Sequence, residues 1–212
     1  MKVGNAIYTC MRAIPLLLAW PFALAVHGHA AHAPVVYAIA PASRLEVATG
    51  KAGLLGFAGH AHLIRARTFT GRLLRDLDDP AQSSVEITIQ TAGLEVLTPP
   101  DTEEIRQVTE SMRRDVLAVE RYPEITFVSR HASAIDGGLH IEGALTIVGH
   151  TVLVPVDVQV RIREDTLFAD ARFTVNQTAF GIKPYRGGPG GVVRVADRVK
   201  FDIAIVALRV TE

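Results

Sequence analysis

The sequence predicts an all-β fold, an antiparallel barrel of about eight strands with one inserted α-helix. Residues 139–162 form two runs in which apolar and polar residues alternate, a period of two that is typical of strands with one face in water. Residues 102–120 instead carry apolar residues at spacings of three and four, which is typical of a helix lying against a sheet. No internal repeat or linker divides these segments, so the sequence predicts a single barrel domain.

The two central runs predict an antiparallel hairpin. In the second run every even position from 152 to 162 is valine or isoleucine, whereas most odd positions tolerate water. Gly149, His150 and Thr151 form a short connection, with a glycine that can take a positive φ. Pro155 cannot donate to a ladder, which predicts a bulge or a locally unpaired stretch. Arms of this length suit a barrel wall.

Shorter runs predict the remaining strands. Pro41 separates the first two strands, and Gly56 and Gly59 are expected to bend the third. Residues 76–81 have the composition of a turn, and the glycine-rich residues 187–191 that of a loop. The expected strands cover residues 35–40, 44–48, 53–66, 68–74, 85–89, 125–130, 166–175, 176–182 and 198–210.

The one expected helix follows Pro99 and Pro100 and ends before Pro123. Asp101 is its expected N-cap, and Glu104, three residues later, completes a capping box. Its apolar stripe predicts that one side packs against the sheet. The stripe consists of Ile105, Val108, Met112, Val116 and Val119.

The first thirty residues predict a secretory signal peptide. Lys2 and Arg12 precede an uncharged apolar run at 13–26, and small residues and histidines follow it. The run is short for a membrane span. We expect cleavage after Ala30, which leaves residues 31–212 as the barrel domain of a periplasmic or secreted protein. A retained N-terminal anchor is the alternative.

The only cysteine, Cys10, lies before the apolar run, whereas a lipoprotein cysteine would lie at the cleavage point. The expected mature chain therefore has no disulfide and no thiolate metal site. Its stability must come from a hydrophobic core, for which residues 31–212 are long enough.

Charge and composition argue against a nucleic-acid partner. The whole chain has 22 basic and 22 acidic residues, and removal of Lys2 and Arg12 leaves 20 against 22, a formal charge of −2. No basic stripe is present, and aromatic residues, at 6%, are too few for a stacking platform.

His60 and His62 are the residues that come nearest to a metal site. Positions i and i+2 of a strand share a face, so both imidazoles can reach one ion. No spacing identifies a third ligand among His131, His140, His150 or the carboxylates. The simpler interpretation is a polar pair at the barrel mouth and no bound metal. A metal-binding or enzymatic barrel centred on this pair is the alternative.

No motif supports catalysis. The sequence lacks a G-x-S-x-G elbow, an H-E-x-x-H helix, a phosphate loop and a dinucleotide fingerprint, so we expect neither an enzyme nor a cofactor. A barrel of about eight strands can instead enclose one ligand, and a long apolar chain gains about 0.8 kcal/mol per buried methylene. A filled barrel, as in an envelope-stress or interaction protein, is the second alternative.

Four stretches carry a resemblance to a known family. They are the Phe57/His62 strand leading to 70–73 (TGRL), 122–129 (YPEITFVS), 141–151 (IEGALTIVGHT) and 173–182 (FTVNQTAFGI). In the order and spacing of these stretches, the chain resembles the YceI-like family of secreted polyisoprenoid-binding proteins. The resemblance implies an extended lipocalin-like barrel, an apolar tunnel for an isoprenoid chain, and a helix beside one entrance.

The resemblance also implies the partners and the site. The partner would be a lipophilic small molecule, bound by a monomer or homodimer with peripheral or transient membrane contact. Residues 182–186 depart from the family pattern, and Lys183 or Arg186 there can meet an anionic headgroup. The residues expected to line or close the cavity are Phe57, His60, His62, Phe69, Phe127, Phe173, Phe180 and Tyr185.

Overall fold

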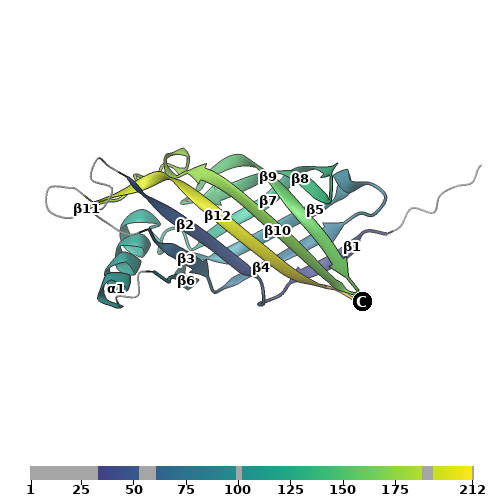
Figure 1. Cartoon of the computed structure of the whole chain (residues 1–212), viewed down its shortest axis with the longest axis horizontal. Helices are drawn as coiled ribbons and strands as arrows, with labels where there is room; N and C mark the ends of the chain where they lie inside the picture. Colours follow the sequence, from purple (N-terminus) through teal and green to yellow (C-terminus); the bar gives the residue numbers. More distant parts are fainter. Residues whose placement is uncertain (1–32, 53–60, 99–101, 188–192, 212) are drawn as a thin grey trace, which may run out of the picture. The chain divides into compact units, whose positions relative to one another are not determined.

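Twelve strands form one antiparallel sheet in the computed structural model, which describes residues 33–52, 61–98, 102–187 and 193–211. The strands are β1 (Val35–Ile39), β2 (Arg44–Ala52), β3 (Leu63–Ala66), β4 (Phe69–Arg75), β5 (Ser84–Gln90), β6 (Leu94–Val96), β7 (Glu124–Ile135), β8 (Gly138–Ile147), β9 (His150–Arg163), β10 (Thr166–Asn176), β11 (Arg186–Gly187) and β12 (Val193–Arg209) (Figure 1). The helical elements are η1 (Pro80–Gln82), η2 (Thr91–Gly93), α1 (Thr102–Ser111), η3 (Met112–Val116) and η4 (Gln177–Phe180).

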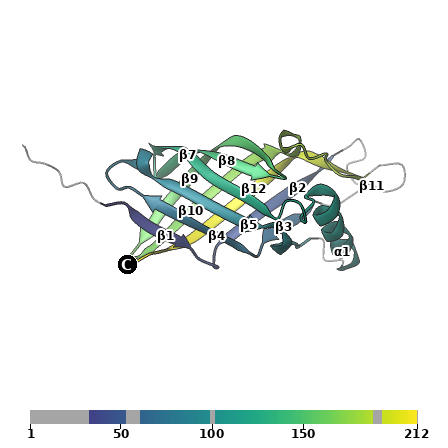
Figure 2. The ribbon, with the colours of Figure 1, turned by 180° about the vertical axis from the view of Figure 1, so that it is seen from behind.

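The sheet closes into a barrel, and three positions of its wall are each occupied by two short strands in succession. These pairs are β1 and β2, β3 and β4, and β5 and β6. β12 pairs with β2 along its first part and with β1 near its end. β3 and β4 pair with β2 and β1 in turn, and β6 and β5 pair with β3 and β4. The wall therefore has eight strands, with β1/β2, β3/β4 and β5/β6 each counted once and with β11, which pairs only with β12, left out. Figure 2 shows the β1, β4 and β5 side, and the predicted antiparallel barrel is confirmed.

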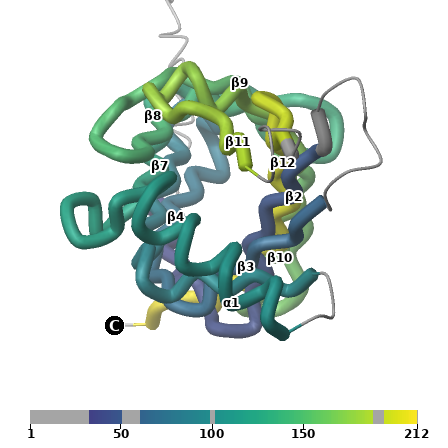
Figure 3. The backbone as a smooth tube through the Cα atoms, turned by 90° about the vertical axis from the view of Figure 1, so that its left-hand side faces the viewer, coloured from purple at the N-terminus to yellow at the C-terminus, as the bar shows by residue number. Residues whose placement is uncertain are grey.

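The helix lies at one end of this barrel, where the pairing of the wall is interrupted. Among the described strands β6 pairs only with β3, because the pairing of β5 with β7 ends at Gln90 and Glu124. α1 lies beside β6 at this end, and Figure 3 views the ring of strands from there. Arg113 anchors the helix by donating from Nη2 to the carbonyl oxygens of Ala92 and Leu94, at 2.9 and 3.3 Å.

The helix ends earlier than predicted. α1 runs to Ser111 and continues as the π-helical turn η3 to Val116, rather than to residue 120. Ala118 has a φ of 44°, and its carbonyl accepts hydrogen bonds from the amides of Arg121 and Tyr122, which closes a turn instead of another helical turn. The expected N-cap, Asp101, lies outside the described residues. In the described part of the chain, no helix has the length and hydropathy to cross a bilayer.

The central hairpin is confirmed, with a different turn. The turn residues are Val148 and Gly149, with φ values of 44° and 76°, and His150 already belongs to β9. Pro155 pairs opposite Glu142 with no register shift, so a bulge at this position was the wrong prediction. The pairing of β9 with β10 ends at Val158, so the predicted unpaired stretch exists on the β10 side of Pro155.

Other strand predictions were wrong in extent, since β2 continues to Ala52 and β7 to Ile135, beyond the predicted ends at residues 48 and 130. Residues 177–180 form the 3-10 turn η4, and Gly181, with a φ of 72°, ends it, so 176–182 is not a strand. β12 begins at Val193 rather than at residue 198 and has an irregular register between Val195 and Val199. Residues 53–60 of the expected third strand lie outside the described part.

Candidate functional site

The barrel encloses two neighbouring cavities. The outer cavity, at the helix end, has a volume of about 720 Å³, and the inner cavity has about 130 Å³. The outer volume lies within the range of about 300–1,000 Å³ that is usual for sites of small organic ligands. Alternation along the strands turns one side chain in two toward this space, so the sequence pattern that builds the barrel also makes its interior apolar.

β12 shows how the wall is built. Val199, Phe201 and Ile203 line the outer cavity, whereas Lys200 and Asp202 between them carry charge on the other face. Phe201 pairs directly with Phe173 of β10, and the two rings stack with centroids 4.7 Å apart and an interplanar angle of 7°. Such a stack adds to the apolar burial of both rings and fixes their orientation.

Among the described residues, the polar groups of the outer cavity come largely from the helix and from segments near the helix end of the barrel. The helix contributes Glu104, Gln107, Glu110, Ser111 and Arg114. The strands and turns contribute Thr49, His62, Gln177, Tyr185 and Arg194, and Glu46 also borders the cavity although Arg44 and Arg65 hold its carboxylate. The inner cavity, in contrast, is lined almost entirely by aliphatic and aromatic side chains. A ligand with an apolar chain and a polar head would therefore be complementary to this space only with its head toward the helix.

His62 is held in place at the mouth by hydrogen bonds. Its Nδ1 lies 2.9 Å from the carbonyl oxygen of Thr98, and its backbone amide donates to Oγ1 of Thr49 at 3.0 Å. Because a carbonyl oxygen only accepts, Nδ1 carries the hydrogen of this bond. Within the described ranges no three histidine, cysteine or acidic side chains gather as a metal site. His60 lies outside these ranges, so the proposed histidine pair stays a prediction.

The predicted site residues fall into four groups. Phe57 and His60 lie outside the described residues. His62, Phe180 and Tyr185 line the outer cavity, and Phe180 is fully buried. Phe127 and Phe173 line the inner cavity. The remaining three, Phe69, Lys183 and Arg186, line neither cavity, since Phe69 packs against the core and both cations are exposed.

The sequence analysis missed several residues of the cavity wall. Phe201 lines both cavities, and the alternation of Val199, Phe201, Ile203 and Ile205 was a signal that could have identified it. Arg194 lines the mouth and pairs directly opposite Arg186 in the β11–β12 hairpin. Nothing in the local sequence pattern distinguishes Arg194 from the other arginines of the chain.

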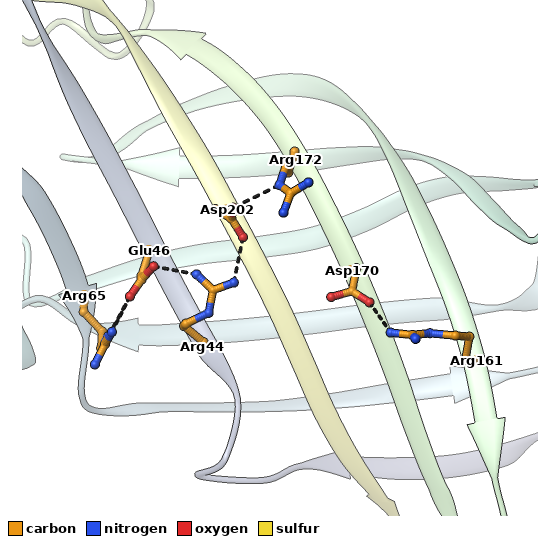
Figure 4. Close-up of polar contacts among 7 residues, drawn as sticks. All are labelled: Arg44, Glu46, Arg65, Arg161, Asp170, Arg172 and Asp202. Atoms are coloured by element: carbon orange, nitrogen blue, oxygen red, sulfur yellow. Dashed lines mark hydrogen bonds and ion pairs between the residues drawn. The ribbon is translucent and has the colours of Figure 1, made fainter.

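A row of charged residues crosses the other face of the same wall (Figure 4). Arg65, Glu46, Asp202 and Arg172 are successive cross-strand partners on β3, β2, β12 and β10. Glu46 and Asp202, two like charges, lie directly opposite each other, and such a pair is unfavourable on its own. Arg44 bridges them, with Nη1 2.5 Å from Oε2 of Glu46 and Nη2 3.0 Å from Oδ1 of Asp202.

This row shifts the pKa of both carboxyl groups. Burial raises the pKa of Glu46, but hydrogen bonds from Arg65 and Arg44 outweigh burial and hold this pKa below its usual value. The hydrogen bond from Arg172 lowers the pKa of Asp202, against a smaller effect of burial, and the charge of Arg44 lowers it further. Both groups are therefore carboxylates at neutral pH, and the row holds the strands that carry the cavity wall.

The YceI-like domain matches residues 40–207 of the chain. Among solved structures, BcnA of Burkholderia cenocepacia matches with a TM-score of 0.61 and 22% identity, over 77% of this chain and 95% of that chain. A polyisoprenoid binding domain from Saccharophagus degradans, implicated in plant cell wall breakdown, matches with a TM-score of 0.57 and 12% identity, over 82% of this chain and 98% of that chain. The YCEI protein of Campylobacter jejuni matches with a TM-score of 0.55 and 13% identity, over 70% of this chain and 85% of that chain. None of the curated proteins compared with the chain matches it.

Proposed function

The chain belongs to the YceI-like domain family, and we propose that it binds a lipophilic molecule, a polyisoprenoid, in the outer cavity without catalysing a reaction. The observation that carries this proposal is the cavity itself, about 720 Å³ of space with polar groups toward the helix end and apolar walls beyond them. The polyisoprenoid binding domain of Saccharophagus degradans, which has a similar fold, supports the choice of ligand.

Binding would rest on burial of the apolar chain. Each methylene that leaves water contributes about 0.8 kcal/mol, so a chain needs few polar contacts to be held tightly. The polar groups at the mouth would then fix its direction, with the head near Arg194 and its cross-strand neighbour Arg186. Lys183 is a further cation of the same segment for an anionic headgroup.

The proposal extends to the place of action. A segment with the layout of a signal peptide, residues 1–30, supports export, and an exported barrel would sequester or carry the lipid in the periplasm. N-terminal sequencing of the protein from the periplasm should begin at Ala31. A chain that still begins at Met1, and that fractionates with membranes, would contradict export as a soluble carrier.

The decisive experiment is mass spectrometry of protein purified from its own host, native for bound mass and then after organic extraction for identity. A prenyl chain at about one per barrel is the expected result. An empty barrel that also takes up no added isoprenoid would refute the proposal. Stoichiometric metal in the same sample, lost in His60→Ala and His62→Ala, would favour the metal-binding alternative instead.

A further inference from the structure

We propose that Phe201 sets the length of the apolar chain that the barrel accepts, because its ring helps to separate the outer cavity from the inner one. This inference rests on the proposed function, and it concerns the same cavity. Five of the described residues line both cavities and therefore lie at the boundary where the two cavities meet, and the inferred constriction consists of these five side chains. They are Leu45, Ile89, Ile125, Phe201 and Ile203.

The constriction is built from opposite sides of the barrel. Leu45 of β2 pairs directly with Ile203 of β12, and Ile89 of β5 pairs directly with Ile125 of β7. In the closed order of eight wall strands, β7 stands four places from β12 in either direction. Ile203 and Ile125 therefore project into the interior from facing strands, with the Phe201 ring beside Ile203.

The Phe201 ring has the position and the support to act as the stop. It is the largest side chain of the constriction, and its parallel stack on Phe173 holds its orientation. A ring held in this way cannot turn aside without losing the stacking contact. Phe173 itself lines only the inner cavity, so the two stacked rings have different positions relative to the stop.

A chain that enters from the helix end would be buried until its tip meets this constriction. Up to that length, each added methylene should tighten binding about fourfold. Further methylenes would stay outside the outer cavity and add little. The wild-type barrel should therefore show an affinity that rises with chain length and then reaches a plateau.

The test is a series of all-trans prenols, from farnesol through geranylgeraniol to solanesol, each competing with a fluorescent prenyl probe. Phe201→Ala should open the constriction and move the plateau to longer chains by at least one isoprene unit. Phe127→Ala is the matched control, since it removes an equal ring from the wall of the inner cavity alone and leaves the Phe201–Phe173 stack intact, so it should leave the plateau in place. Ile203→Ala, which widens the constriction from the same strand, should produce a smaller shift.

Circular dichroism of each variant establishes that it is folded, and Ile203→Ala decides the question if Phe201→Ala does not fold. A wild-type affinity that keeps rising to solanesol would overturn the inference, as would an unmoved plateau in the constriction variants or an equal shift in Phe127→Ala. A wild-type barrel that binds no prenol of any length would overturn the proposed function as well. Binding that increases with chain length without a plateau would overturn only the inference about Phe201.

Discussion

Replacement of Glu46 by glutamine should destabilise the barrel by about 2 kcal/mol at neutral pH. The Glu46 carboxylate accepts hydrogen bonds from Nη1 of Arg44 at 2.5 Å and from Nε and Nη2 of Arg65 at 2.8 and 2.5 Å. Glutamine keeps the shape but loses the charge, and its amide nitrogen would face a guanidinium group that also donates. Only the Asp202 carboxylate would then remain at this point of the wall, so the loss of the like-charge repulsion offsets part of the cost.

The magnitude follows from the exposure of the partners. The Glu46 side chain is only 8% exposed, whereas those of Arg44 and Arg65 are 41% and 32% exposed. Loss of one partner from a fully buried pair costs about 3–5 kcal/mol, and exposed pairs contribute about 0–1 kcal/mol. Solvent screens the two arginines in part, which places the cost between these limits. The melting temperature should fall by about 4–8 °C.

The destabilisation should depend on pH. Because the folded-state pKa of Glu46 is lowered, its stabilising contribution is present above the ordinary glutamate pKa of about 4.3 and is lost as the pH falls through the folded-state value. Glutamine does not titrate. The stability difference between wild type and Glu46→Gln should therefore shrink in acid, below about pH 4.

Urea unfolding, followed by circular dichroism from neutral pH to about pH 2, measures this difference. Glu95→Gln is the matched control, because Glu95 pairs with Arg67 on the same side of the barrel but both side chains are about half exposed, at 47% and 53%. The control should cost at most about 1 kcal/mol. Equal costs for the two variants, or a Glu46→Gln cost that stays constant into acid, would refute the reasoning.

Three further changes test the packing and the cavity. Gly143→Ala should lower the free energy of unfolding by about 1–3 kcal/mol, and with it the urea midpoint, because a Cβ there would overlap the Phe127 ring. An unchanged midpoint would argue against this packing. Val148→Asn should raise the free energy of unfolding by about 1 kcal/mol, and with it the urea midpoint, since asparagine tolerates a φ of 44° better than a β-branched residue. A lower midpoint would contradict this. Val108→Asp, in the outer cavity wall, should weaken binding of a fluorescent prenyl probe at least about tenfold, whereas Thr109→Asp, outside that wall, should not; equal effects would count against the proposed site.

The fold could be predicted because alternation is a local property of strands that have one wet and one dry face. The valines and isoleucines from 152 to 162 fixed the inward side of β9, and the pairing of β8 with β9 follows from that choice. The helical stripe identified α1 for the same reason. The end of its π-helical continuation η3 at Val116 was not predictable, because the turn at Ala118 and the contact of Arg113 with β6 depend on distant chain segments.

The segment 176–182 shows how tertiary packing overrides a local pattern. Its composition allows a strand, but Phe180 is fully buried and lines the outer cavity. The 3-10 turn at 177–180 and the left-handed Gly181 bring the ring into that position. A strand would have carried the chain along the barrel wall instead.

By itself the sequence determined most of the strands, the helix, the apolar interior and the resemblance to a family, because these depend on the order of residue types along the chain. Only the tertiary structure decided that the space inside the barrel is divided into an outer and an inner cavity. The volume of each cavity depends on which side chains face one another across the barrel. Leu45 and Ile203 are far apart in sequence and adjacent in the wall. The same holds for Arg44 and Asp202, whose ion pair allows two like charges to stand opposite each other. Closure of the barrel creates these contacts, and no local pattern encodes them.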